Sequence, residues 1–162
     1  MGAEQPVAVP RLTWMNLVGE LRERGRGRRE SGAFLAARQG DLSRRIDRFV
    51  CYDDLDPHAL DDGFVTLHGE GMSKLWALCK RDSLTVLADV HTHPGRDTRQ
   101  SAIDRQYPMV PMAGHLALIL PNFGHTSRWS LEGVGIHVFE GDGRWRSYRA
   151  GQKETPVRLS VW

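Results

Sequence analysis

The sequence has few cysteines, little net charge and no long apolar run. Cys51 and Cys79 are too few for a disulfide framework, and neither belongs to a C-x2-C pair. A formal charge of +2 gives no reason to expect nucleic acid or a membrane surface as a partner. No apolar stretch is long enough to span a bilayer. These shortages favour a cytoplasmic protein with reduced thiols, in which any metal site is built mainly from histidines and carboxylates.

The length of 162 residues and the hydrophobic content of 40% are typical of one globular domain with a single substantial core. Residues 1–10 lack the basic and apolar segments of a secretory signal, and we expect them to form a flexible leader. The domain is expected over residues 11–150, followed by a C-terminal tail over residues 151–162. Five arginines between Arg22 and Arg29 are interpreted as a solvated helix end rather than a site for an acidic partner.

Apolar periodicity predicts one α/β domain with a mixed sheet. A first helix is expected to begin after Thr13 and end at Gly25, and a second to begin at Ser73. A short helix should run from Ser101 to Gln106 and end before Pro108.

Apolar, partly β-branched runs predict the strands. The run from Leu84 to Val90 should be a central strand that is buried on both faces. Gly141-Asp142-Gly143 is typical of a hairpin turn between the last two strands. The other strands are expected over residues 30–37, 48–52, 64–67, 115–120, 133–140 and 144–148, with a loop over 53–63.

The most informative segment follows the central strand and reads H-x-H-x7-S-x2-D. It consists of His91, His93, Ser101 and Asp104. Residues i and i+2 of a strand face the same side, about 7 Å apart along the chain, so two imidazoles there can converge on one ion. With one carboxylate they make three ligands and leave a fourth tetrahedral position for water, which distinguishes a catalytic zinc site from a closed structural one. The spacing therefore predicts a catalytic metal site.

Zinc in such a site lowers the pKa of water toward about 7 and polarises a carbonyl. A base is also needed to move the proton to a leaving amine, and a glutamate fits that role. Ser101 lies one helical turn from Asp104, where its hydroxyl could donate to a developing oxyanion. The pattern predicts hydrolysis of an amide-like bond without a covalent enzyme intermediate.

The histidines outside this segment have no comparable spacing and are interpreted as structural or surface residues. For His115, which opens an apolar run, a supporting role beside the ligands is the alternative. Cys51 and Cys79 are interpreted as small buried apolar residues.

His91-Thr92-His93-Pro94, the spacer, Ser101 and Asp104 together resemble the JAMM motif of the JAB/MPN metalloprotease family. Glu30-Ser31-Gly32 is similar to the upstream glutamate of that family, and the resemblance extends from about Glu30 to Tyr148. It implies that the two histidines and Asp104 bind zinc (Zn²⁺), that Glu30 is the general acid/base, and that Ser101 helps to hold the tetrahedral intermediate.

The same resemblance implies a curved mixed β-sheet flanked by helices, as in cytidine deaminases. Family members hydrolyse isopeptide or peptide bonds after the C-terminal glycine of ubiquitin-like proteins, which implies such a protein or its conjugate as partner. Relatives of ubiquitin-activating and ubiquitin-conjugating enzymes would belong to the same pathway. Asp89 and Val90 stand where eukaryotic members commonly have tryptophan, and we expect this to alter packing rather than chemistry.

Three alternatives remain open. The chain could release an amino acid or peptide from a sulfur-carrier-type protein; the RadC family shares a similar motif but is less like the segment after Asp104. A second alternative is a non-catalytic MPN scaffold, although such proteins usually lack the metal ligands. A nucleic-acid role for the arginines is disfavoured because no aromatic residues are interleaved with them.

Overall fold

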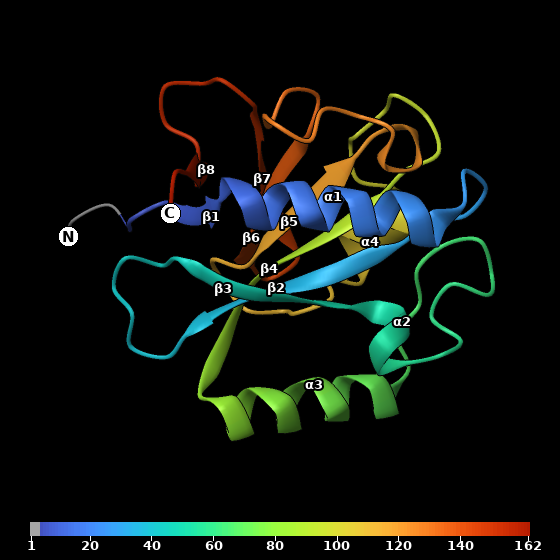
Figure 1. Cartoon of the computed structure of the whole chain (residues 1–162), viewed down its shortest axis with the longest axis horizontal. Helices are drawn as coiled ribbons and strands as arrows, with labels where there is room; N and C mark the ends of the chain where they lie inside the picture. The colour runs from blue at the N-terminus through green and yellow to red at the C-terminus, as the bar shows by residue number, and fades with distance from the viewer. Residues whose placement is uncertain (1–3) are drawn as a thin grey trace.

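The computed structural model describes residues 4–162 as a strongly twisted sheet with helices on both faces (Figure 1). The six-stranded sheet has the order β3-β2-β4-β5-β6-β7, in which β4 and β5 are parallel and the other neighbours antiparallel. The expected α/β domain with a mixed sheet is confirmed. In chain order the elements are β1 (Val7–Pro10), α1 (Arg11–Gly25), β2 (Gly32–Arg38), β3 (Ile46–Cys51), α2 (Tyr52–Leu55), α3 (Gly69–Asp82), β4 (Leu84–Thr92), α4 (Ala102–Gln106), β5 (Leu116–Leu120), the 3-10 turn η1 (Asn122–Gly124), β6 (Gly135–Gly141), β7 (Arg144–Arg149) and β8 (Val157–Ser160).

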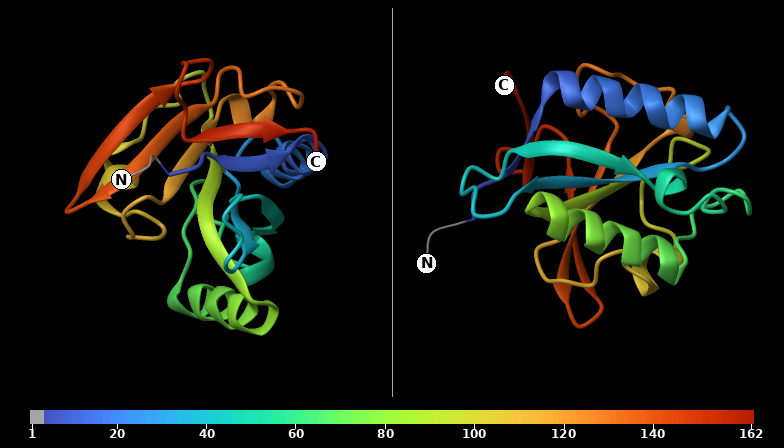
Figure 2. Two further views of the ribbon diagram at one scale, coloured as in Figure 1. Left: turned by 90° about the vertical axis from the view of Figure 1, so that its left-hand side faces the viewer. Right: turned by 60° about the horizontal axis from the view of Figure 1, so that its bottom comes forward.

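Helices α1 and α3 lie on opposite faces of the sheet (Figure 2), and an apolar core fills the space on each face. On one face, α1 buries Trp14, Leu17 and Leu21 against the sheet, as their helical spacing predicts. On the opposite face, Leu75 of α3 packs with Phe34 of β2. Because both faces of β4 are covered, this strand is a rigid platform. Within residues 4–162, no helix combines the length and apolar character that a membrane crossing requires.

An extra residue in β4 decides which face its side chains reach. Leu35 of β2 pairs with Ala88 and Ala36 pairs with Val86, so Leu87 forms a β-bulge. Val86 consequently packs on the α3 side, whereas Ala88 belongs to the core under α1. Simple alternation from Val86 would turn His91 toward α1. The bulge turns it, together with Asp89, to the α3 side.

Both chain ends were assigned wrongly from the sequence. Val7–Pro10 is a buried strand rather than part of a flexible leader, and it pairs in parallel with Val157–Ser160 of the expected tail. Each strand has only four residues, and its partner lies at the far end of the chain, so local patterning gave no signal for either. Residues 1–3 of the expected leader lie outside the described residues.

The segment before α3 also differs from expectation. No strand forms over residues 64–67, and the start of the expected loop is the short helix α2. Helix α3 begins at Gly69 rather than at Ser73, and its first turn packs closely: a Cβ on Gly71 would lie 2.9 Å from a methyl carbon of Leu67. Helix α1 likewise begins at Arg11, before the expected cap Thr13.

We predict that Val157→Ala lowers the free energy of unfolding by about 2 kcal/mol, because the side chain is fully buried and its truncation leaves a cavity. Chemical denaturation would measure the loss. The matched control is Val161→Ala, since Val161 is 69% exposed and should be neutral. Equal stability of the two variants would mean that residues 151–162 are a tail outside the core.

Candidate metal centre

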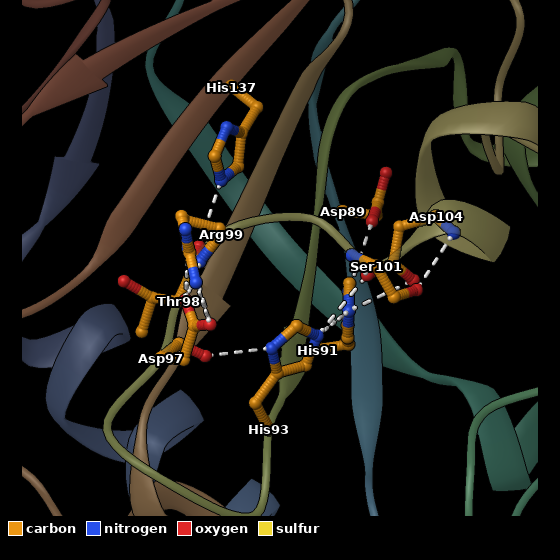
Figure 3. Close-up of polar contacts among 9 residues, drawn as sticks. All are labelled: Asp89, His91, His93, Asp97, Thr98, Arg99, Ser101, Asp104 and His137. Carbon is orange, nitrogen blue, oxygen red and sulfur yellow. Dashed lines mark hydrogen bonds and ion pairs between the residues drawn. The ribbon is translucent and has the colours of Figure 1, made fainter.

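The structure brings the three sequence-predicted ligands, His91, His93 and Asp104, into one cluster. The Nε2 atoms of the two histidines are 3.2 Å apart, and that of His93 is 3.2 Å from Oδ2 of Asp104. Nε2 of His91 lies 3.5 Å from Oδ1 of the same carboxylate. Ligand atoms about 2.0–2.1 Å from a tetrahedral ion are separated by about 3.3 Å. The cluster therefore fits a single metal ion, and Figure 3 shows both rings directed at Asp104.

Backbone pairing fixes the two histidines. His91 belongs to β4 and pairs with Gly32 of β2 and with Ile119 of β5. The amide of His93, just beyond the strand, donates to the carbonyl of Leu120 over 2.8 Å. The two rings thus project from a backbone held on both sides by neighbouring strands.

Ser101 and Asp104 form a reciprocal cap at the start of α4. The Ser101 hydroxyl accepts from the Asp104 amide at 3.1 Å, and the Asp104 carboxylate accepts from the Ser101 amide at 2.8 Å. Burial alone would raise the pKa of Asp104, but hydrogen bonds from His91, His93 and the Ser101 amide hold it well below the usual range. The carboxylate is therefore ionised and oriented, while the hydroxyl proton of Ser101 remains free to donate elsewhere.

Glu30 precedes β2 and lies beside the end of β4. The Ser31 amide donates to the Thr92 hydroxyl, and the Thr92 amide donates to the Ser31 carbonyl. Extending this register by one residue places Glu30 opposite His93. Burial raises the pKa of Glu30, an effect opposed by the electrostatic influence of His91 and His93. Its proximity to the ligands, which the residues alone did not predict, results from the β2–β4 pairing.

Each histidine ring of the cluster has an acceptor at or near its Nδ1 atom. Nδ1 of His93 donates to the carbonyl of Asp97 at 2.9 Å, and Nδ1 of His91 faces Oδ2 of Asp89 at 4.0 Å. Nε2 of His115 contacts the other oxygen of Asp89 at 2.7 Å, and both of these side chains are buried. A carboxylate behind a metal-binding imidazole fixes its tautomer and orientation.

Asp89 was missed as a functional candidate. The available signal was a lone acidic residue in an apolar strand, two positions before His91 and hence on its face. His115, interpreted from the sequence as structural with a supporting role as the alternative, contacts Asp89 rather than a ligand.

Other residues singled out from the sequence lie apart from the ligand cluster. His137 is buried; its Nε2 donates to the Thr98 carbonyl, its Nδ1 accepts from Ser147, and burial lowers its pKa. This ring secures the loop that leads to Ser101. Cys51 and Cys79 are free and buried, and burial raises the pKa of both thiols.

Removing either of two ligands should abolish metal binding. We expect the purified protein to hold about one ion per chain, and His93→Ala and Asp104→Ala to hold none, because each leaves only two ligands. Metal content by mass spectrometry measures the result. His58→Ala is the control because that ring is exposed, with 76% of its side-chain surface accessible. Retention of the ion by both ligand variants would contradict the site.

Replacing Asp89 should weaken the site without removing a ligand. Asp89→Asn keeps the shape of the side chain and one oxygen to accept from His115, but it removes the negative charge behind His91. The affinity for metal should therefore fall about 10–100-fold. Isothermal titration with zinc as the probe ion would measure it. Asp142→Asn is the control, since that carboxylate is 94% exposed. Unchanged affinity in folded Asp89→Asn protein would exclude the supporting role.

Comparison with known proteins indicates the family to which the chain belongs. No family model matches the chain. A relative named probable metalloprotease y4jG, from Sinorhizobium fredii, is 30% identical over 117 residues, which are 72% of each protein. A solution structure from Desulfitobacterium hafniense shares the fold at a TM-score of 0.62 and 16% identity, covering 94% of this chain and 92% of that one. A JAB1/MPN domain protein from Archaeoglobus fulgidus aligns at a TM-score of 0.43 and 13% identity, over 98% of this chain and 100% of its own.

The identity and coverage of the metalloprotease relative give the family, and its name implies a bound metal. The ligand cluster, with Ser101 capping the helix that carries Asp104, has the JAMM motif order. The chain belongs to the JAB/MPN family of metalloproteases.

Proposed function

We propose that this protein is a zinc-dependent peptidase, deubiquitinase-like, that hydrolyses the isopeptide or peptide bond after the C-terminal glycine of a ubiquitin-like protein. The observation that carries the proposal is the convergence of His91, His93 and Asp104 beside the half-buried Glu30. A complete ligand set also argues against the non-catalytic scaffold. The second candidate, release of an amino acid or peptide from a carrier-type protein, uses the same chemistry.

Zinc suits the donor set of two imidazoles and one carboxylate, which is the composition of several catalytic zinc sites. When bound, it supplies Lewis acidity that acidifies a water and polarises the scissile carbonyl. His91, His93 and Asp104 would hold it. The Asp97 carbonyl accepts from Nδ1 of His93, and the charge of Asp89 favours a proton on Nδ1 of His91, which would leave both Nε2 lone pairs available to the ion.

Glu30 is the proton carrier in this proposal. Its carboxylate accepts a proton from the attacking water and returns it to the nitrogen of the leaving group. A pKa raised by burial suits both tasks, because acid/base catalysis is most efficient when the pKa lies near the working pH. The Ser101 hydroxyl, which accepts from the Asp104 amide, directs its own proton toward the developing oxyanion.

In this proposal the substrate tail lies in a groove beside the loop that leads to Ser101. A groove of about 1120 Å³ runs from the loop around Thr98 to the ends of β6 and β7. Within the described residues, β7 pairs with β6 alone, so its other edge can accept an extended strand. The ubiquitin-like partner, and activating and conjugating enzymes of its pathway, are part of the proposal, as is a cytoplasmic location for a protein with two free thiols.

Glu30→Gln should retain the metal and lose roughly 10²–10⁴-fold in kcat/KM, because the amide cannot accept the proton. The assay follows cleavage of a panel of ubiquitin-like and sulfur-carrier-like proteins, each extended beyond its C-terminal Gly-Gly by a short peptide. Glu23→Gln provides the control, since Glu23 is exposed on α1. Full activity of metal-loaded Glu30→Gln would remove Glu30 from the mechanism, and no cleavage of any panel member by the wild type would reject the proposed function.

A further inference from the structure

A small apolar cavity of about 320 Å³ opens directly beside the metal ligands. His91 and Asp104 line it, so whatever occupies it lies next to the bond being cleaved. Its remaining walls are mainly apolar and aromatic and come from several separate parts of the chain. They include Phe64, Leu67, Met72, Ile103, Tyr107 and Trp145.

The walls are attached to fixed parts of the fold. The indole N–H of Trp145, on β7, donates to the carbonyl of Arg105 on α4 at 3.0 Å. Met72 lies in the first turns of α3, and Leu67 packs against the same region, close to Gly71. Several walls nevertheless stay open to solvent: Phe64, Ile103 and Tyr107 are 48%, 60% and 66% exposed. Exposed apolar side chains around a cavity beside a catalytic centre are typical of a binding site.

The charges around the cavity limit which kinds of substrate side chain it can bind. Among the described residues, the carboxylates that line it are Asp104, a metal ligand, and Asp89, which is paired with His115. Neither is free to pair with a cationic substrate group. A cationic substrate side chain would therefore lose water without gaining a partner, which is costly, whereas an apolar one gains by burial.

The size of the cavity favours a bulky occupant over a slender one. A volume of 320 Å³ corresponds to about ten water molecules at liquid density. The four methylenes of an isopeptide-linked lysine would fill only part of it. An aromatic or branched aliphatic side chain would fill much more and bury more apolar surface.

The proposed function indicates whether the side chain in the cavity belongs to the acyl part of the substrate or to the leaving group. A C-terminal glycine on the acyl side has no side chain to offer. The wide groove and the small cavity share Gln100, the neighbour of Ser101, so a tail in the groove continues past the ligands toward the cavity. The residue in the cavity then belongs to the leaving group.

We propose that this cavity is a specificity pocket for a bulky apolar, preferably aromatic, side chain on the first residue of the leaving group. This rests on the proposed function and narrows it: the substrate is a linear peptide bond that joins glycine to a hydrophobic residue, as in an extended carrier-type protein, rather than an isopeptide bond to lysine.

Cleavage of matched substrates tests the proposal with metal-loaded enzyme. The probes are peptides that share one acyl part ending in Gly-Gly and continue with Phe, Leu, Ala or an ε-linked Lys. We expect kcat/KM for Phe to exceed that for Ala by at least about tenfold, with ε-linked Lys no better than Ala. Ile103→Glu, which charges an exposed wall of the pocket, should reduce the Phe preference to below about threefold. Leu12→Glu, at an equally exposed site on α1, should leave it unchanged.

Binding without catalysis provides an independent readout. In the metal-free protein, phenylalanine amide should shift the indole resonance of Trp145 in a saturable way, and alanine amide should not. Cleavage of all peptides at similar rates, or best cleavage of ε-linked Lys, would overturn the pocket while leaving the proposed function standing. No cleavage of any peptide, combined with a saturable shift of the Trp145 resonance, would reject the proposed reaction and keep the apolar pocket. Absence of that shift would overturn the pocket.

Discussion

The direction of His91 depends on the single extra residue in β4. The bulge at Leu87 lets Ala88 and Val90 fill the core under α1, while Asp89 and His91 point to the other face. A one-residue change of register in a strand reverses every side chain beyond it. The same bulge therefore places a ligand, its supporting carboxylate and one wall of the apolar cavity on one side of the sheet. Bulges next to active sites commonly re-aim side chains in this way.

Burial of Asp89 shows how the site and the fold share their energetics. A buried carboxylate is costly unless it is paired and hydrogen-bonded, and here His115 supplies one contact at 2.7 Å. The second oxygen faces His91, whose Nδ1 proton gains a negative neighbour. The metal acts on the same balance, because an ion that binds only the folded chain stabilises it by mass action. Ligand geometry and domain stability are consequently linked through one strand.

The sequence predicted the local parts of the site and missed the non-local ones. The i, i+2 spacing at the end of a strand was sufficient to predict that His91 and His93 lie together. The serine one turn before Asp104 was sufficient to predict where α4 begins. The approach of Glu30 depends on antiparallel pairing across about sixty residues, and only the family resemblance suggested it. The strand pair at the chain ends has the same character: four-residue segments carry too little periodicity to be recognised without their partner.

Chemistry and specificity are built from different parts of this fold. His91, His93 and the candidate base lie on, or directly beside, strands β2 and β4, whose pairing fixes their positions, whereas Asp104 comes from the first turn of α4. The apolar cavity instead takes walls from the irregular segment that contains Phe64, from short helix α4 and from edge strand β7. Such elements tolerate substitution far better than a central strand. Substitutions in the segment around Phe64 and in β7 can therefore alter the apolar cavity without moving the strands that position His91 and Glu30.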